Sequence, residues 1–243
     1  MPPAPHALVL AAGYGLRLRP ITETTPKCMV EIGGRPLLDH WVHALLHAGV
    51  RRAVVNTHHL PEPVAAYARH VRETTPLELH DAFEETLLGS GGTLARHRDL
   101  ADGTDCVVIV YADNLSAVDL RALVAEHRAQ RHPFTMALFR AENPRACGIA
   151  TLADDGTVTA FTEKPEQPAS DLANAGVYVL DADAYREAAD LGGADIGFDV
   201  LPRFVGRMHG SPIRGYHRDV GTLAALERAR ADFAAGLVTG GGA

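Results

Sequence analysis

Hydrophobic residues recur along the chain with two different spacings. Continuous apolar runs of strand length occupy residues 7–12 and 106–112, and such runs are typical of strands buried on both faces of a parallel sheet. A further strand is predicted at 52–57. Between them, apolar residues three or four positions apart predict helices over 36–49 and 61–74. Strands that alternate with helices in this way predict a parallel sheet with right-handed crossovers.

The second half of the chain is richer in strand patterns. Segments 148–152 and 157–162 flank Asp154-Asp155-Gly156, which is typical of a hairpin turn. Further strands are predicted at 30–32, 77–80, 134–140, 174–180 and 213–220, and further helices at 119–131, 182–189, 198–205 and 222–235. No linker separates independent domains, so we expect a single domain with a sheet-rich lobe inserted in its second half.

Composition and charge exclude some classes of binding partner. The chain has 243 residues and a net charge of -7, and without a basic stripe it is not expected to bind nucleic acid or a membrane surface. Its cysteines are three and widely spaced, which favours a reducing compartment over a disulfide framework. Neither a signal-peptide pattern nor a run of membrane-spanning length occurs, so we expect a cytoplasmic protein.

The first predicted strand ends in a loop with candidate chemistry. This loop reads Gly13-Tyr14-Gly15-Leu16-Arg17, and Lys27 follows it. Glycines allow close backbone approach, and backbone N–H groups beside two cations could cradle a polyphosphate. The loop is not a Walker sequence, and Leu18 stands where a dinucleotide fingerprint has its third glycine. A tight strand exit with two surface cations explains the same residues equally well. Cys28 follows Lys27, whose charge could lower the pKa of the thiol.

Two aspartates near strand ends are candidates for a metal ion. Asp113 follows the most apolar run of the chain, so it should lie at the sheet edge where open α/β sheets bind ligands. Asp219 lies near the end of the strand predicted at 213–220. Beside a polyphosphate, one or two carboxylates are natural Mg²⁺ ligands. An Asx turn at Asp113 and a helix N-cap at Asp219 remain alternatives, although Thr222 could serve as the cap instead.

A third group of charges, Glu163-Lys164-Pro165, closes a strand of the lobe. Lys164 could neutralise a substrate phosphate, and Glu163 could accept hydrogen bonds from sugar hydroxyls. Taken alone, such a group is usually only the exposed end of a hairpin.

These motifs share an order and spacing that is characteristic of one family. Along residues 7 to about 226 they read LVLAAGYGLRLRPIT, PKCM, LLGSGG, YADN, FTEKP, NAGVYVL and RDVGT. In this set and order the chain resembles the sugar-phosphate nucleotidylyltransferases, in particular the compact mannose and heptose 1-phosphate guanylyltransferases. The resemblance implies a Rossmann-like, GT-A-type α/β fold with a mixed, mostly parallel sheet flanked by helices. It also implies an enzyme that joins a sugar 1-phosphate to a nucleoside triphosphate and releases pyrophosphate.

The resemblance further implies a division of the single domain, residues 1–243. Its parts are a nucleotide-binding half at about 6–132, a sugar-phosphate-binding lobe at about 133–220, a terminal helix at 221–236 and a loose tail at 237–243. Assembly into a homo-oligomer is open, because Leu226 and Phe233 on the terminal helix could belong to the core or to an interface.

Individual residues take roles by the same resemblance. Nucleotide-binding residues are Leu10, Ala11, Ala12, Gly13, Gly15, Arg17, Lys27, Leu88, Gly89 and Asp113. Sugar-phosphate-binding residues are Gly148, Glu163, Lys164, Asn174 and Gly176. Catalytic residues are Arg17, Lys27, Asp113 and Lys164, and Mg²⁺ ligands are Asp113 and Asp219.

The substrate is less determined than the family. The segment around Leu88 and Gly89 resembles guanylyl- and uridylyltransferases, which favours GTP, while UTP, ATP and CTP stay open. The second substrate could be a sugar or a cyclitol phosphate. There are two alternatives. One is a non-catalytic regulatory homologue, and the other is a cytidylyltransferase for a phosphorylated alcohol such as choline phosphate. The presence of Arg17, Lys27 and Asp113 speaks against the first, and Lys164 against the second.

Overall fold

A computed structural model describes residues 2–239, so part of the predicted tail, residues 240–243, lies outside the described residues. The chain forms two compact units. The N-terminal unit consists of residues 4–87, 110–122 and 214–239, and the inserted unit of residues 2–3, 88–109 and 123–213. The functional division of the chain near residue 132 remains a prediction.

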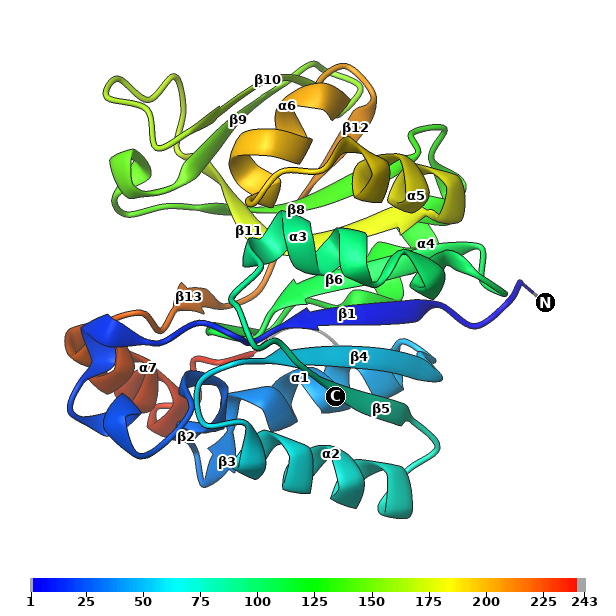
Figure 1. Cartoon of the computed structure of the whole chain (residues 1–243). Coiled ribbons are helices and arrows are strands. Elements are labelled where there is room, and N and C mark those ends of the chain that lie inside the picture. Colours follow the sequence, from blue (N-terminus) through cyan, green and yellow to red (C-terminus); the bar gives the residue numbers. More distant parts are fainter. Residues whose placement is uncertain (1, 240–243) are drawn as a thin grey trace. The chain divides into compact units, whose positions relative to one another are not determined.

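Three parallel strands form the sheet of the N-terminal unit (Figure 1). They are β1 (His6–Leu10), β4 (Arg52–Thr57) and β5 (Glu78–Phe83), and β1 pairs with β4, which pairs with β5. After β6 (Cys106–Tyr111), the N–H of Ala112 donates to the carbonyl of Leu10 at 3.0 Å. The predicted parallel sheet is confirmed, because long apolar runs can be buried only with helices or strands on every side.

Helices of the N-terminal unit bury their apolar faces. Helix α1 (Leu37–His47) begins directly after Pro36 and buries Trp41 among its apolar residues. Helix α2 (Pro61–Thr74) lies beside β5 (Figure 1). Helix α7 (Leu223–Ala234) starts where the Thr222 side chain accepts a hydrogen bond from the N–H of Ala225 at 3.1 Å. Thr222 is therefore the N-cap, which leaves Asp219 available for another role.

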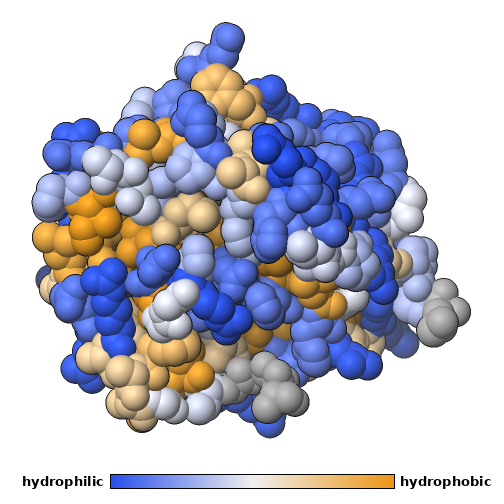
Figure 2. All heavy atoms as spheres, turned by 90° about the horizontal axis from the view of Figure 1, so that it is seen from below, coloured by the Kyte–Doolittle hydropathy of each residue, from blue (hydrophilic) through white to orange (hydrophobic). Residues whose placement is uncertain are grey.

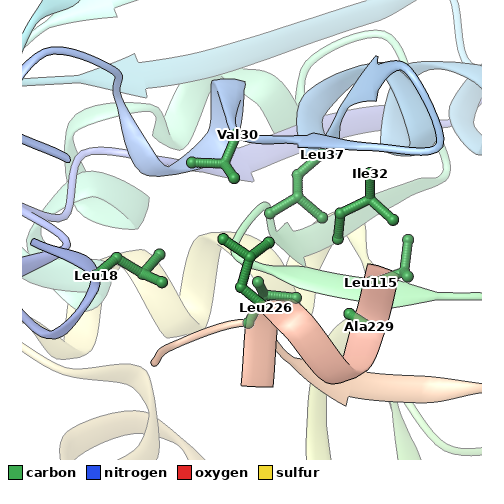
Figure 3. Close-up of a cluster of buried hydrophobic side chains, with 8 residues drawn as sticks. Leu18, Val30, Ile32, Leu37, Leu115, Leu226 and Ala229 are labelled. Atoms are coloured by element: carbon green, nitrogen blue, oxygen red, sulfur yellow. The ribbon is translucent and has the colours of Figure 1, made fainter. Parts of the chain in front are cut away.

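One hydrophobic cluster joins the first loop, helix α1 and helix α7 (Figure 3). Its buried members are Leu18, Val30, Ile32, Leu37, Leu115, Val220, Leu226 and Ala229. Phe233 packs against the cluster, and its ring fills the space where any side chain at Gly33 would lie. Leu226 is therefore a core residue, and Phe233 is partly buried against the core. Full burial of one such leucine contributes about 1.5–3 kcal/mol.

Short elements complete the N-terminal unit. Strands β2 (Glu31–Ile32) and β3 (Arg35–Pro36) form one antiparallel pair, and β7 (Asn114–Ser116) and β13 (His217–Asp219) form another. Three turns of 3₁₀ helix follow β1, at Leu16–Leu18, Ile21–Glu23 and Lys27–Met29.

The inserted unit is a mixed sheet with helices. Its strands are β8 (Phe134–Arg140), β9 (Gly148–Leu152), β10 (Val158–Glu163), β11 (Leu172–Asp181) and β12 (Met208–Pro212). β9 and β10 form the predicted antiparallel hairpin, β11 is antiparallel to β8, and β12 is parallel to β8. Its helices are α3 (Gly89–Arg96), α5 (Ala182–Leu191) and α6 (Leu201–Phe204), with 3₁₀ turns at Arg98–Ala101 and Pro144–Ala146 and a π-helical turn at Ile196–Val200. Helix α4 (Leu120–Ala129) begins in the N-terminal unit.

The structure differs from the sequence-based predictions of local structure in two places. The strand predicted at 213–220 is limited to β13, and β12, which ends before residue 213, is a separate strand with a different partner. The helix predicted at 198–205 consists of the π-helical turn followed by α6. Pro202 lies in the first turn of α6, where the backbone N–H that proline lacks has no partner within the helix. Residues 89–93 form the start of α3, where Gly89 and Gly91 pack closely against residues 193–195.

Surface features of the described residues are mixed. Hydrophobic areas lie among hydrophilic residues on the face shown in Figure 2. The large hydrophobic side chains with the highest exposure include Leu16, Phe198 and Leu237. Across residues 2–239, none of the helices has the length and apolar character that a membrane crossing requires.

Candidate active site

The loop after β1 has a conformation that requires glycine at one position. Gly15 has a φ of 64°, in the left-handed region. Its carbonyl accepts hydrogen bonds from the N–H of Leu18 at 2.9 Å and from the hydroxyl of Thr22 at 2.8 Å. A Cβ at Gly15 would lie 2.8 Å from a methyl carbon of Thr22. Both the backbone and the packing therefore exclude larger residues, and the loop is held in one tight turn. Gly13, in contrast, has open space around it.

Lys27 lies at the centre of a charged group in the N-terminal unit. Its ammonium is 2.7 Å from a carboxylate oxygen of Asp113 and 3.5 Å from one of Asp219. The Lys27 side chain is 10% exposed, whereas those of Asp113 and Asp219 are 39% and 54% exposed. A buried ammonium needs partners, and the two carboxylates supply them while each keeps a face open to solvent.

Backbone pairing brings the two aspartates together across a long stretch of sequence. Asp113 follows β6, and Asp219 ends β13. β13 pairs with β7 so that Asp219 stands opposite Asn114, and the N–H of Val220 donates to the carbonyl of Asp113 at 3.0 Å. Main-chain hydrogen bonds thus bring the backbones of both aspartates together, and the Lys27 ammonium contacts both carboxylates.

Arg17 extends the charged group toward solvent. Its guanidinium lies 3.9 Å from the carboxylate of Asp219, and its side chain is 68% exposed. Gly221 packs against the same two groups, because a Cβ there would lie 2.7 Å from the guanidinium and 2.8 Å from the carboxylate. Gly221 belongs to the RDVGT motif quoted above. Only the structure shows that the absence of a side chain at Gly221 leaves room for the two charged groups.

The electrostatic surroundings act differently on three nearby groups. Loss of hydration raises the pKa of Asp219, Lys27 lowers it, Asp113 raises it further, and Arg17 again lowers it. Burial lowers the pKa of His217 to about 4, so this neighbour is neutral at pH 7. Burial raises the pKa of the Cys28 thiol to about 12. Lys27 therefore does not lower the pKa of Cys28, which is an inert core residue.

The donor atoms at Asp113 and Asp219 suit a hard divalent cation. No group of three or more His, Cys, Asp and Glu side chains within residues 2–239 is arranged to hold a metal ion. Mg²⁺ typically takes only one or two carboxylates from the protein and completes its shell with water and phosphate oxygens. Two half-exposed carboxylates that already share one cation, the Lys27 ammonium, fit this requirement.

A second group of predicted residues lies in the inserted unit. Glu163 ends β10 with its side chain 16% exposed, and Lys164 follows with a φ of 47°. Burial raises the pKa of Glu163, Lys164 opposes this rise, and Asp195 adds to it. A side chain at Gly148 would collide with the Glu163 carboxylate. The left-handed backbone of a non-glycine residue such as Lys164 is uncommon and is often associated with functional sites.

The remaining predicted residues of the inserted unit also have defined positions. The amide of Asn174 donates to the Tyr178 hydroxyl at 2.7 Å, and its oxygen accepts from the N–H of Gly176 at 2.9 Å. Gly89 has a φ of 75° and packs against the carbonyl of Ala194.

The structure thus distributes the predicted residues between the two units. Within the N-terminal unit lie residues 10–17, Lys27, Asp113 and Asp219, and within the inserted unit lie Leu88, Gly89, Gly148, Glu163, Lys164, Asn174 and Gly176. Only two lysines occur in the sequence, Lys27 and Lys164, and one lies in each group. Sequence reasoning overlooked Phe198, whose ring lies 6.0 Å from the Lys164 ammonium, because a single aromatic residue in a helical pattern carries no signal.

Comparison with known proteins identifies the family of this chain. The sequence matches the nucleotidyl transferase family over residues 6–236. The chain belongs to this family. Among solved structures, a putative glucose-1-phosphate thymidylyltransferase from Bacillus anthracis, in complex with a sucrose, superposes with a TM-score of 0.81 at 25% identity and covers 94% of each chain. The predicted family and the predicted Rossmann-like α/β fold are therefore confirmed.

Two curated relatives have more specific names. The mannose-1-phosphate guanylyltransferase of Mycobacterium tuberculosis is 31% identical over 95% of this chain and 65% of its own length. The mannose-1-phosphate guanyltransferase of Schizosaccharomyces pombe is 30% identical over 88% of this chain and 60% of its own length. The chain thus spans less than two thirds of the length of either relative.

Proposed function

We propose that the protein is a sugar-1-phosphate nucleotidylyltransferase, which forms a nucleotide sugar and releases pyrophosphate. The observation that carries the proposal is the buried Lys27 ammonium between Asp113 and Asp219, beside the glycine loop of residues 13–17. This arrangement supplies cations and carboxylates for a polyphosphate and its metal ion. Family membership and the names of the relatives support the same reaction.

The proposed reaction needs no covalent enzyme intermediate. A phosphate oxygen of the sugar 1-phosphate attacks the α-phosphorus of the nucleoside triphosphate. A new P–O bond forms as the bond to the β-phosphate oxygen breaks, and pyrophosphate leaves on the opposite side. Two anions must meet and charge builds on the leaving group, so position and electrostatics account for most of the catalysis.

Residues of the N-terminal unit would act on the nucleotide. The backbone from Leu10 to Gly15 would bind it, and Arg17 and Lys27 would bind the α-phosphoryl group and the departing pyrophosphate. Asp113 and Asp219 would hold Mg²⁺, which when bound neutralises phosphate charge.

Residues of the inserted unit would contact the base of the nucleotide and the second substrate. Leu88 and Gly89 would border the base. Lys164 would bind the attacking phosphate, and Glu163 would accept hydrogen bonds from sugar hydroxyls. Gly148, Asn174 and Gly176 would line the same region and shape it for the sugar.

We favour GTP and mannose 1-phosphate as substrates, because both curated relatives described above are named for that pair. The thymidylyltransferase name of the structural neighbour keeps the base open. A cytoplasmic location suits a protein that uses nucleoside triphosphates, and assembly into a homo-oligomer remains a prediction.

The test is pyrophosphate release from a panel of four nucleoside triphosphates crossed with several phosphates. The second substrates include mannose, glucose and heptose 1-phosphates, a cyclitol phosphate and choline phosphate, each with and without Mg²⁺. We expect the highest kcat/KM with GTP and mannose 1-phosphate, and no release without Mg²⁺. Release only with CTP and choline phosphate would favour the alcohol cytidylyltransferase instead. No release from any pair would identify a non-catalytic member of the family.

A glycine substitution tests the packing of the charged group. We expect Gly221→Ala to lower kcat/KM by about tenfold, because the added methyl group would displace the Asp219 carboxylate or the Arg17 guanidinium from a preorganised position. Steady-state kinetics and thermal unfolding measure the two effects separately. An unchanged kcat/KM would show that neither group needs its observed position.

A further inference from the structure

A fully buried carboxylate of the N-terminal unit has no part in the reaction described above. Glu84 follows β5 and has 0% of its surface exposed. Its main-chain N–H donates to the carbonyl of Thr57 at 2.8 Å, which fixes it beside the end of β4. Burial of a carboxylate is costly unless hydrogen bonds compensate, so a specific arrangement around Glu84 is expected.

The Glu84 carboxylate is connected to the first loop through one asparagine. It accepts a hydrogen bond from the side-chain amide of Asn56 at 2.9 Å. The side-chain oxygen of Asn56 accepts in turn from the N–H of Ala11 at 2.7 Å. Asn56 is 4% exposed, so its amide cannot rotate without leaving buried groups unpaired. The carboxylate therefore fixes which end of Asn56 faces Ala11.

The main chain of Glu84 is connected to the same loop by a second route. Its carbonyl lies 2.7 Å from Nδ1 of His58, and because a carbonyl only accepts, Nδ1 carries the proton. Nε2 of the same ring is hydrogen-bonded to the Tyr14 hydroxyl at 2.7 Å. The rings of Tyr14 and His58 also make an edge-to-face contact, with centroids 5.1 Å apart.

The two routes reach the loop on either side of Gly13. Ala11 precedes this glycine and Tyr14 follows it. Gly13 has no packing contact of its own at the Cβ position, so the two ties restrict a segment that would otherwise be free to move. Restricting a binding loop before its ligand arrives reduces the entropy lost on binding.

From this geometry we propose that Glu84 is a positioning residue for nucleotide binding. Through Asn56 and through His58 it holds Ala11 and Tyr14 so that the backbone around Gly13 is preorganised for the triphosphate. The inference rests on the proposed function in assigning this loop to the nucleotide. It adds three residues that act through the loop, Glu84, Asn56 and His58, and a tyrosine whose hydroxyl anchors it.

Equilibrium binding of GTP with Mg²⁺, measured by calorimetry, tests the proposal without turnover. Each broken tie removes one hydrogen bond worth about 1 kcal/mol, so we expect Tyr14→Phe and Asn56→Ala each to raise Kd by about fivefold. The Tyr14→Phe change removes a single hydroxyl from a half-exposed side chain, so it does not endanger folding. Tyr67→Phe is the matched control, since it removes a hydroxyl bonded to Asp39 in the same unit, and its Kd should stay at the wild-type value.

Double substitutions separate the two routes. Tyr14→Phe combined with His58→Ala should weaken binding no more than the larger single change, because both residues belong to one route. Tyr14→Phe combined with Asn56→Ala should weaken binding by about the product of the single effects. Glu84→Gln, which keeps an acceptor for the Asn56 amide, should bind more tightly than Glu84→Leu.

Steady-state kinetics distinguish positioning from a general structural role. The variants should raise KM for GTP and leave KM for the sugar phosphate unchanged. Wild-type Kd values for both Tyr14→Phe and Asn56→Ala would overturn the proposal, even if pyrophosphate release confirms the enzyme. Conversely, weaker GTP binding by the variants of a wild-type protein that binds GTP without turnover would support the proposal and reject the enzyme. A wild-type protein that does not bind GTP would overturn both.

Discussion

Replacement of Lys27 by alanine is expected to lower kcat by about a hundredfold or more, which is the scale of losing one preorganised charge contact. The ammonium is buried and held 2.7 Å from Asp113, so no mobile solvent cation can take over its position. In the proposed reaction this charge would stabilise the α-phosphoryl group and the leaving pyrophosphate. Single-turnover kinetics with saturating substrates isolate the chemical step.

Two further variants separate the charge of Lys27 from its packing. Lys27→Met keeps most of the side-chain volume and should lose as much activity as Lys27→Ala. Arg121→Ala, which removes an exposed cation from the same unit, should leave kcat unchanged. Near wild-type turnover in Lys27→Met would show that the ammonium does not act in the reaction.

Metal binding by the Lys27→Met variant gives a second test that does not depend on turnover. The Lys27 ammonium contacts Asp113 and Asp219, the same carboxylates that would bind a divalent cation. In the absence of nucleotide, the ammonium should therefore weaken metal binding. We expect Lys27→Met to bind Mn²⁺ alone roughly tenfold more tightly, or about 1.4 kcal/mol, as measured by the paramagnetic resonance of free Mn²⁺. Unchanged Mn²⁺ affinity would contradict a metal site at these carboxylates.

Replacement of Asp113 by asparagine is expected to abolish metal-dependent turnover, a loss of about a thousandfold or more. The substitution preserves shape and keeps an oxygen that can accept a hydrogen bond from Lys27. It removes the negative charge that a hard cation requires. Main-chain hydrogen bonds from Val220 and the pairing of β7 with β13 fix this residue, so the fold should remain intact.

Asp119→Asn is the matched control for Asp113→Asn. Asp119 lies six residues further along the chain, and its side chain accepts a hydrogen bond from the N–H of Ala122 at 2.9 Å. Asparagine caps a helix about as well as aspartate, so this control should keep both activity and thermal stability. If Asp113→Asn instead unfolds the protein, Asp113 is a structural turn residue rather than a metal ligand.

Local structure could be predicted where the hydrophobic pattern has one interpretation. The strand at 52–57, the helix at 61–74 and the strands at 134–140 and 148–152 have the predicted bounds. Each combines a clear apolar spacing with turn or proline residues near its ends. The segment 208–220 has no such clarity, and its two strands are defined only by pairing with β8 and with β7.

The residues of the candidate site could be predicted from the sequence, but the contacts between them could not. The order and spacing of the motifs, through their resemblance to one family, pointed to Arg17, Lys27, Asp113, Lys164 and Asp219, although each residue taken alone also had a structural explanation. Nothing in the pattern indicated that Lys27 is buried, or that the Cys28 thiol beside it has a raised pKa. Asn56 and Glu84 were also hidden, because polar residues at strand ends usually face water.

The sequence by itself determined the family and the alternation of strands and helices, and it indicated the charged residues of the candidate site. These properties depend on short-range spacing and on side-chain chemistry. Only the tertiary structure decided that one ammonium stands between two carboxylates, and that a buried glutamate holds the loop beside it. Those contacts join residues far apart in the chain, and their energies depend on burial and on hydrogen-bond direction, neither of which spacing encodes.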